Sequence, residues 1–250
     1  MPARGTRPNL LAGEDLLPEP RQQRSTAKRV AINAAALVLF AEKGYEATSI
    51  EDIVQRAELA TGGFYQHYRS KRQLLLSLMD DLLEYMSQLD LSPGGAKDVR
   101  AMLHGFLVRA FAGDLRYLGA YRAWEEATLS DPDLARKDRQ IHAWTTARVL
   151  RLFEFLHTLP GARPEVALAV LARVMDNFFW GLLARAVRAR KAELNEWIDT
   201  SAGLIYHALF TDSAPHRAEH GFVACRRAEN VEMAFNSMHK NQHSRHRETE

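Results

Sequence analysis

Apolar residues recur every three or four positions along most of the chain, and this spacing predicts helices. The first helix begins near Ser25 and carries an apolar stripe at i, i+4, i+7, i+8 and i+11, made by Val30, Ala34, Leu37, Val38 and Ala41. Gly44 is well placed to end this helix in the left-handed conformation. No segment keeps a period of two between turn signals, so the expected fold class is all-α.

Two capping signals follow the first helix. Thr48 and Glu51 have the spacing of a capping box, and Ser70 and Gln73 repeat it at the start of a long leucine-rich helix. Between the two boxes the pattern predicts a short second helix, a four-residue turn over 57–60 and a short third helix. Three helices joined in this way within residues 26–72 match a helix-turn-helix motif inside a three-helix unit.

The third helix has too few large apolar residues to be a buried core helix. Phe64 and Tyr68, four positions apart, are its expected inward anchors. Its remaining positions carry small or polar side chains at Thr61, Gly62, Gly63, Tyr65, Gln66 and His67. Hydroxyl, amide and imidazole groups can bond to phosphate oxygens or base edges, and small residues allow a close approach to a groove wall. Lys71 adds a cation at the start of the next helix, where backbone amides favour phosphate.

The rest of the chain divides into further helices and two irregular ends. Helices are expected over about 97–112, 115–129, 132–157, 164–190 and 192–210; Asp131 is the expected N-cap before Pro132. The expected domains are a disordered leader (1–20), a helix-turn-helix domain (21–72), a helical-bundle domain (73–211) and a disordered tail (212–250).

The formal net charge of +2 conceals an uneven distribution. Residues 21–72 contain nine basic and five acidic residues, a net charge of +4, whereas residues 73–211 contain 16 basic and 17 acidic residues. A surface that binds a polyanion would therefore lie in the first third of the chain, and charge alone favours the alternative of a solvated helical surface with ordinary charge scatter. This excess is too small for a protein that packages DNA without sequence preference.

Composition excludes several other classes. The most apolar stretch, residues 164–187, contains Arg173 and Asp176, so no membrane span is expected. The first 20 residues lack the apolar core of a signal peptide, and the single cysteine, Cys225, fits a reducing cytoplasm. No catalytic constellation or phosphate-binding glycine loop occurs, and the tail histidines are irregularly spaced; no enzyme activity, cofactor or metal is predicted.

Polar residues among the aromatics of the second region have two possible roles. His104, His142 and Asn177 stand close in sequence to aromatic side chains, and Trp124 and Trp144 belong to the same aromatic set. A buried polar group needs a partner, which is either another protein group or a bound small molecule. These five residues are the candidate effector contacts, with an ordinary satisfied core as the alternative.

At residues 40–75 the chain resembles the TetR family of bacterial transcriptional regulators. The matching phrases are Gly44-Tyr45-x-x-Thr48-Ser49-Ile50 and Gly63-Phe64-Tyr65-x-His67-Tyr68-x-Ser70-Lys71. The resemblance implies an N-terminal DNA-binding unit, a helical bundle that binds a small effector, and a homodimer formed through the last two long helices. It also implies a repressor that its effector releases from a near-palindromic double-stranded operator.

Carried over by position, the resemblance assigns DNA contacts to eight residues. It places Thr48, at the start of the second helix, on phosphate. It places four residues in the major groove, namely Thr61, Gly62, Gly63 and Gln66, and three on the DNA backbone, namely Tyr65, His67 and Lys71. Two positions depart from the family pattern: Glu58 occupies a turn position that is often Gly, and Ala60 cannot cap the third helix, which is expected to begin at Thr61.

The alternative function is a helical-bundle enzyme or ligand carrier with a vestigial DNA-binding unit. The exposed polar third helix and the lack of an acid–base or nucleophile set in the sequence disfavour it.

Overall fold

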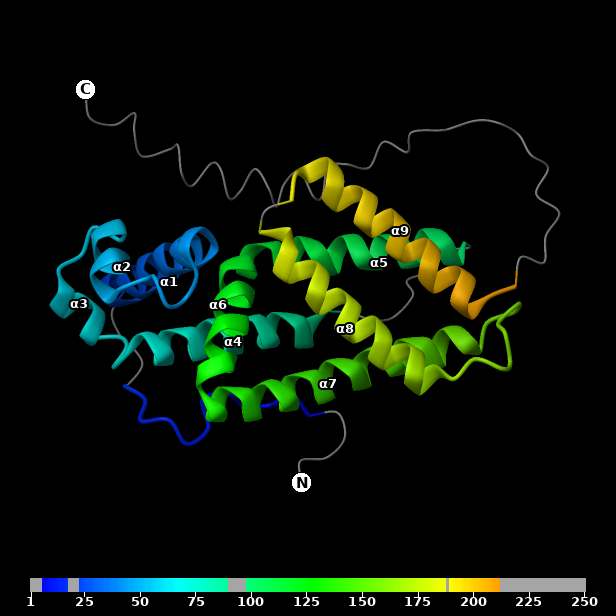
Figure 1. Cartoon of the computed structure of the whole chain (residues 1–250), viewed down its shortest axis with the longest axis horizontal. Helices are drawn as coiled ribbons and strands as arrows, with labels where there is room; N and C mark the ends of the chain where they lie inside the picture. The colour runs from blue at the N-terminus through cyan, green and yellow to red at the C-terminus, as the bar shows by residue number, and fades with distance from the viewer. Residues whose placement is uncertain (1–5, 18–22, 90–97, 188, 212–250) are drawn as a thin grey trace. The chain divides into compact units, whose positions relative to one another are not determined.

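A computed structural model describes residues 6–17, 23–89, 98–187 and 189–211 (Figure 1). The helices in these residues are α1 (Gln23–Lys43), α2 (Ile50–Arg56), α3 (Thr61–Tyr65), α4 (Lys71–Gln88), α5 (Val99–Asp114), α6 (Leu118–Ser130), α7 (Pro132–His157), α8 (Leu168–Ala186) and α9 (Lys191–Leu209), with a short 3₁₀ helix, η1, at Leu115–Tyr117. The only strand-like feature of the described residues is an isolated bridge between Ala162 and Phe210. The all-α prediction is confirmed; the predicted tail, 212–250, lies outside the described residues.

The chain forms two compact units. Unit 1 contains residues 1–88, 117–145 and 179–188, and unit 2 contains residues 89–116, 146–178 and 189–250. α7 and α8 therefore contribute residues to both units. This division differs from the expected boundary after residue 72, because α4 and α6 pack within the same unit as the predicted helix-turn-helix.

α4 is the central helix of unit 1. Its buried residues occupy most of its circumference and include Leu74, Leu75, Leu76, Leu78, Met79, Leu82 and Leu83. A helix that is apolar on nearly all sides must be surrounded by other elements, and α4 packs against α6. The start of this helix, which directly follows α3, is thereby fixed to the core of the unit.

The buried face of α1 differs from the predicted stripe. Ile32, Ala36, Leu39 and Phe40 face the core, whereas Val30 is 62% exposed. Two helical registers overlap in this alanine-rich sequence, and the larger Phe40 and Ile32 occupy the core. α1 approaches α6 so closely that a Cβ at Gly119 would overlap the carbonyl of Leu37, which explains the glycine at this position.

The local end signals of two helices, α1 and α7, behave as expected. Gly44 has φ +87° directly after α1, as a left-handed C-terminal residue requires. Asp131 Oδ1 accepts hydrogen bonds from the amides of Asp133 and Leu134, at 2.9 and 3.2 Å, which makes Asp131 the N-cap of α7. The five helices predicted after residue 97 are present, with ends displaced by up to four residues.

The predicted disordered leader is partly ordered. Among its described residues, 6–17, Leu10 is fully buried, and Arg7 forms an ion pair with Asp80 of α4. An apolar side chain that finds a buried site, together with ion pairs to distant helices, offsets the entropy of ordering a segment rich in proline and glycine. Residues 1–5 and 18–20 of the leader lie outside the described residues.

Unit 2 is built around the contact of α5 with α9. Leu103 and Leu107 of α5 are buried, as are Leu194, Ile198 and Ile205 of α9. The loop after α7 joins the end of α9, since the amide of Arg163 donates to the Leu209 carbonyl at 2.8 Å. None of the helices in the described parts of the chain combines the length and the apolar character that crossing a bilayer requires.

Candidate nucleic-acid interface

α2 begins with a capping box one residue later than predicted. Ser49 Oγ accepts from the Asp52 amide, and Asp52 Oδ2 accepts from the Ser49 amide, both at 3.0 Å. Hydrogen bonds from Ser49, together with Lys43 Nζ at 3.2 Å, lower the pKa of Asp52. The sequence Thr48-Ser49-Ile50-Glu51-Asp52 offers two overlapping frames for this motif, and the fold uses the second.

The structure gives no support to the phosphate contact of Thr48, which stays a prediction. The Thr48 side chain is fully buried, and its hydroxyl donates to the Gly44 carbonyl at 2.7 Å. Thr48 therefore closes the loop between α1 and α2. The exposed hydroxyl at the start of α2 belongs to Ser49.

The turn between α2 and α3 is a Schellman motif. The amide of Leu59 donates to the Val54 carbonyl at 2.9 Å, and the amide of Glu58 donates to the Gln55 carbonyl at 3.2 Å. This geometry requires a left-handed residue, and Glu58 supplies it with φ +56°. The strain expected from the departure at Glu58 is present, and Glu58 is the only residue other than glycine with positive φ in the described parts of the chain.

α3 starts at Thr61, as predicted. Ala60 is its N-cap and provides no side-chain hydrogen bond. Phe64 is fully buried and Tyr68 nearly so, which confirms both inward anchors. The Tyr68 hydroxyl donates to Asn33 Oδ1 of α1 at 2.6 Å, so this anchor ties the end of α3 to the first helix.

The outward face of α3 presents four of the predicted DNA contacts. Thr61, Gly62 and Gln66 are exposed, and Tyr65 is 51% exposed although it is large and aromatic. A Cβ added at Gly62 would meet no atom within 4 Å. Packing within this protein therefore does not explain the glycine at position 62. A close approach of α3 to the wall of a DNA groove would explain it. Gly63 is partly covered, and its added Cβ would make an ordinary contact with Leu59.

Lys71 is occupied inside the protein. Its ammonium donates to the carbonyls of Tyr45 and Thr48, at 2.6 and 2.8 Å, and lies 4.3 Å from the centroid of the Tyr45 ring. Burial lowers the pKa of Lys71 and raises that of Tyr45 to about 12. Lys71 thus fastens the start of α4 to the α1–α2 loop, and the structure gives no support to its predicted role as a direct phosphate ligand.

His67 is buried rather than aimed at solvent. It is 9% exposed, and its Nε2 atom has no hydrogen-bond partner among the described residues. Burial lowers the pKa of His67, and the positive charges of Arg29 and Lys28 lower it further. The structure therefore gives no support to the contact of this imidazole with the DNA backbone, which stays a prediction.

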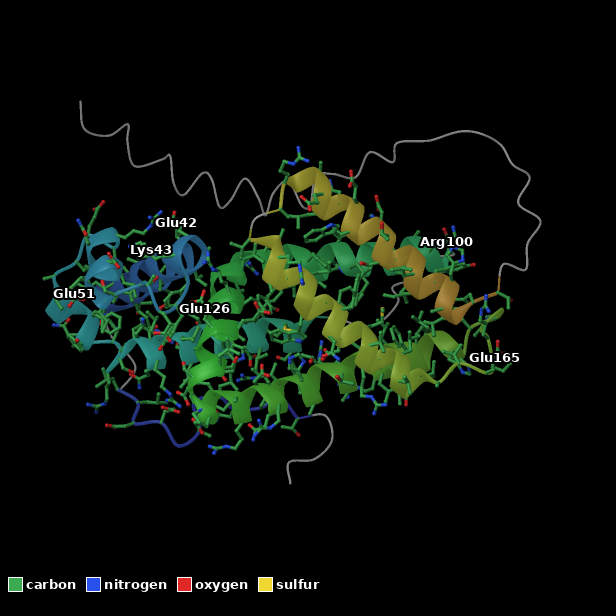
Figure 2. All side chains as sticks on the ribbon, in the orientation of Figure 1. Glu42, Lys43, Glu51, Arg100, Glu126 and Glu165 are labelled. Atoms are coloured by element: carbon green, nitrogen blue, oxygen red, sulfur yellow. The ribbon has the colours of Figure 1, made fainter. Side chains whose placement is uncertain are left out.

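Glu126 of α6 is a positioning residue that the sequence did not reveal. Its Oε2 accepts from the amides of Tyr45 and Glu46, at 2.6 and 3.3 Å, and Figure 2 shows it beside the α1–α2 loop. A Cβ at Gly44 would overlap this carboxylate. The two partners are about 80 positions apart in sequence, and no local pattern links them.

The five candidate effector residues do not form one cluster. Trp124 is buried and its indole N–H donates to Asp138 Oδ1 at 2.9 Å; His142 Nε2 lies 3.9 Å from the same oxygen. Trp144 is also buried, and all three belong to unit 1. Trp124 therefore has the protein partner that the satisfied-core alternative requires.

The remaining two candidates lie in unit 2. His104 Nε2 of α5 is 2.8 Å from Asp199 Oδ1 of α9, and both side chains are substantially exposed. Asn177 is exposed, whereas its neighbour Asp176 is buried and accepts from the Thr146 hydroxyl at 3.1 Å. Neither position has the geometry of an enclosed ligand contact in its own unit, and the residues that would bind an effector stay a prediction.

The site is the outward face of α3 (Thr61, Gly62, Tyr65 and Gln66), held by the buried anchors and by the α2–α3 turn. This arrangement defines a helix-turn-helix protein. Residues 32–78 match the family model described as bacterial regulatory proteins, tetR family. Over these residues the chain has the helix-turn-helix region of the TetR family. The family is described as one of regulatory proteins.

Two kinds of relative share this architecture. The chain is 31% identical over 100 residues to the HTH-type transcriptional regulator TcmR of Streptomyces glaucescens, a match that covers 40% of this chain and 43% of TcmR. The fold is similar to that of NalD, a repressor of a multidrug efflux pump in Pseudomonas aeruginosa, with a TM-score of 0.55 and 19% identity over 77% of this chain and all of that one.

A third similar structure holds a small molecule. The SmeT–triclosan complex gives a TM-score of 0.56 with 20% identity, over 78% of this chain and 98% of SmeT. The solved structures share the fold across most of the chain. The curated relatives are matched over less than two thirds of their own length.

Proposed function

We propose that this protein is a sequence-specific DNA-binding repressor that a small molecule releases from its operator. One observation carries the proposal: a short helix anchored by Phe64 and Tyr68 exposes hydroxyl, amide and aromatic side chains beside an unobstructed glycine. Side chains of these types read base edges and position a helix on phosphates. Gln66 is the proposed base-reading residue, and Tyr65 the proposed phosphate contact.

A homodimer is part of this proposal. Exposed apolar side chains occur at Val170 and Val174 of α8 and at Leu204 of α9, all within unit 2. Large apolar groups in water favour association when they recur on one helix face, and Val170 and Val174 are four positions apart. Two copies would present two α3 helices to half-sites about 34–36 Å apart on one face of the DNA.

The proposed effector is a small, largely apolar molecule that binds in the bundle. The similarity to NalD and to SmeT, which was solved with triclosan, supports this class of ligand. An effector can release DNA only by the free energy with which it prefers the conformation that does not bind DNA. We also propose that the protein acts in the cytoplasm, where its DNA partner is.

The test is a fluorescence-anisotropy titration of the full chain on DNA from the promoters beside its own gene, with a scrambled duplex of equal length as control. Specific binding should exceed binding to the scrambled duplex by at least about 10³-fold at physiological salt. Gln66→Ala should change the preference among operator variants, and Tyr65→Phe should weaken binding to all of them by a similar factor. Equal affinity for the promoter and scrambled duplexes would refute the specific-regulator proposal.

Two further measurements test the other parts. Sedimentation equilibrium should give a dimer for the wild type and a shift toward monomer for Val174→Glu. Leu129→Glu, which places the same charge at an exposed apolar position of unit 1, is the control. A thermal-shift screen of hydrophobic small molecules should identify ligands, which must then lower DNA affinity in the same titration. A ligand that binds and leaves DNA affinity unchanged would favour the ligand-carrier alternative.

A further inference from the structure

The segment 6–17, which we call the arm, packs on two helices of unit 1. Leu10 is fully buried. Its amide donates to Asp80 Oδ1 of α4 at 3.2 Å, and its carbonyl accepts from Lys137 Nζ of α7 at 2.7 Å. Leu10 is therefore held in three ways: its side chain is buried, its backbone amide donates a hydrogen bond and its backbone carbonyl accepts one. The dark-blue trace in Figure 1 follows this segment beside α7.

The first half of the arm is held along α4. Arg7 lies 2.7 Å from Asp80 Oδ1 and 3.1 Å from Glu84 Oε2. These two carboxylates are one helical turn apart and receive the guanidinium together. The guanidinium of Arg7 is thus paired with carboxylates of the protein.

The second half of the arm clamps the turn between α3 and α4. The carbonyl of Asp15 accepts from Arg69 Nε at 2.9 Å and from Gln73 Nε2 at 3.0 Å. Glu14 Oε2 lies 2.8 Å from Arg72 Nη1. Arm contacts therefore reach Arg69, just before α4, and Arg72 and Gln73 in its first turn.

Arg72 joins the arm to the start of α7. Besides Glu14, its guanidinium binds Asp131 Oδ2 at 2.8 Å and Asp133 Oδ2 at 2.5 Å. Burial lowers the pKa of Arg72, but Asp131 and Glu14 together raise it above its ordinary value. Three carboxylates from two separate segments contact one guanidinium. This geometry is typical of an ionic cluster within a protein, and not of an arginine that is free to bind phosphate.

We propose that the arm is a positioning element for DNA recognition: it fixes the α3–α4 turn to α7 and thereby sets the orientation of α3. Leu10 and Glu14 are its positioning residues, and neither touches DNA. The inference rests on the proposed DNA-binding function. The family match covers residues 32–78 and does not include the arm.

The first test measures position without DNA. Nitroxide labels at Glu51→Cys on α2 and Gln140→Cys on α7, both exposed positions of unit 1, report the distance between helix-turn-helix and bundle by pulsed electron resonance in a Cys225→Ser background. Leu10→Ala should broaden or shift this distance distribution, Leu10→Met should restore it, and Leu16→Ala, an exposed leucine of the same arm, should leave it unchanged. An unchanged distribution in Leu10→Ala would overturn the proposal.

The second test measures DNA affinity and its salt dependence in the unlabelled full chain. Leu10→Ala should lower operator affinity at least about fivefold, while the slope of log affinity against log salt stays as in the wild type, because no phosphate contact is lost. A flatter slope would mean that the arm binds DNA directly and would overturn the proposal, as would unchanged or increased affinity. Glu14→Gln, which removes one charge and leaves the core intact, should reduce affinity in the same direction by a smaller factor.

The two proposals fail in distinguishable ways. If the wild type does not prefer operator DNA, the proposed function fails, and the label distances still report whether the arm positions the helix-turn-helix. If the wild type binds specifically and Leu10→Ala is folded by circular dichroism yet unaltered in both tests, only the arm proposal fails. Should Leu10→Ala not fold, Glu14→Gln in the same labelled background decides: an unchanged distance and affinity would overturn the proposal.

Discussion

Glu58→Gly should stabilise the protein, because Glu58 holds a left-handed backbone that its side chain disfavours. Its φ of +56° is imposed by the two hydrogen bonds of the Schellman turn, from Leu59 to Val54 and from Glu58 to Gln55. The left-handed conformation costs a residue other than glycine about 1–2 kcal/mol. Glycine recovers that cost but loses about 0.5–1 kcal/mol through the greater freedom of its unfolded chain. The expected net gain is about 0.5–1 kcal/mol.

Urea denaturation followed by tryptophan fluorescence is a suitable assay. Three of the four tryptophans, Trp124, Trp144 and Trp180, lie in unit 1 together with Glu58, so the signal reports the unit that is changed. Glu58→Ala is the matched control, since it removes the charge and keeps the Cβ that causes the strain. A gain in Glu58→Ala equal to that in Glu58→Gly, or no gain in Glu58→Gly, would refute the backbone argument.

Three other changes test the site. Gly62→Ala should raise stability slightly, by up to about 1 kcal/mol through helix propensity, yet lower operator affinity by anisotropy; unchanged affinity would contradict close approach to a groove wall. Lys71→Met should destabilise the protein by about 1–3 kcal/mol in urea, because two carbonyls lose their donor, and should leave the salt slope of DNA binding unchanged; a slope flatter by about one unit would restore the phosphate role. The pKa of His67 is lowered in the folded protein, so the unfolded chain binds a proton more readily than the native state. The stability of the wild type should therefore fall relative to that of His67→Gln as pH falls from 7.5 through about 6.5. Parallel curves of stability against pH would exclude this linkage.

Signals confined to a few neighbouring residues were sufficient for much of the fold. Asp131 and Pro132 predicted the start of α7, and Gly44 the left-handed end of α1, because a cap or a positive φ depends on the local backbone. Where two local frames compete, the sequence does not decide between them. Thr48 and Ser49 both fit a capping box, and the choice of Ser49 follows from the burial of Thr48 against the Gly44 carbonyl.

The sequence was sufficient to predict the exposed residues of the candidate site. It was not sufficient to predict the contacts of the residues that support α3. Tyr65 and Gln66 could be assigned to solvent from the spacing of Phe64 and Tyr68 alone. Lys71 and His67 could not, because their surroundings come from the α1–α2 loop and from α1. From the sequence alone, a lysine beside a predicted recognition helix fits either a phosphate contact or a contact within the protein, because phosphate oxygens and backbone carbonyls both accept hydrogen bonds from an ammonium.

The charge of the N-terminal third takes on a different meaning once the ion pairs are known. Arg69 and Arg72 contribute to the net +4 of residues 21–72, yet both are paired with carboxylates of the arm, and Lys71 is bound to carbonyls. These three cations stabilise the α3–α4 turn and are held by protein groups. The salt slope of DNA binding should therefore be smaller than the basic count suggests, and specificity must come chiefly from the shape and hydrogen-bonding groups of the α3 face.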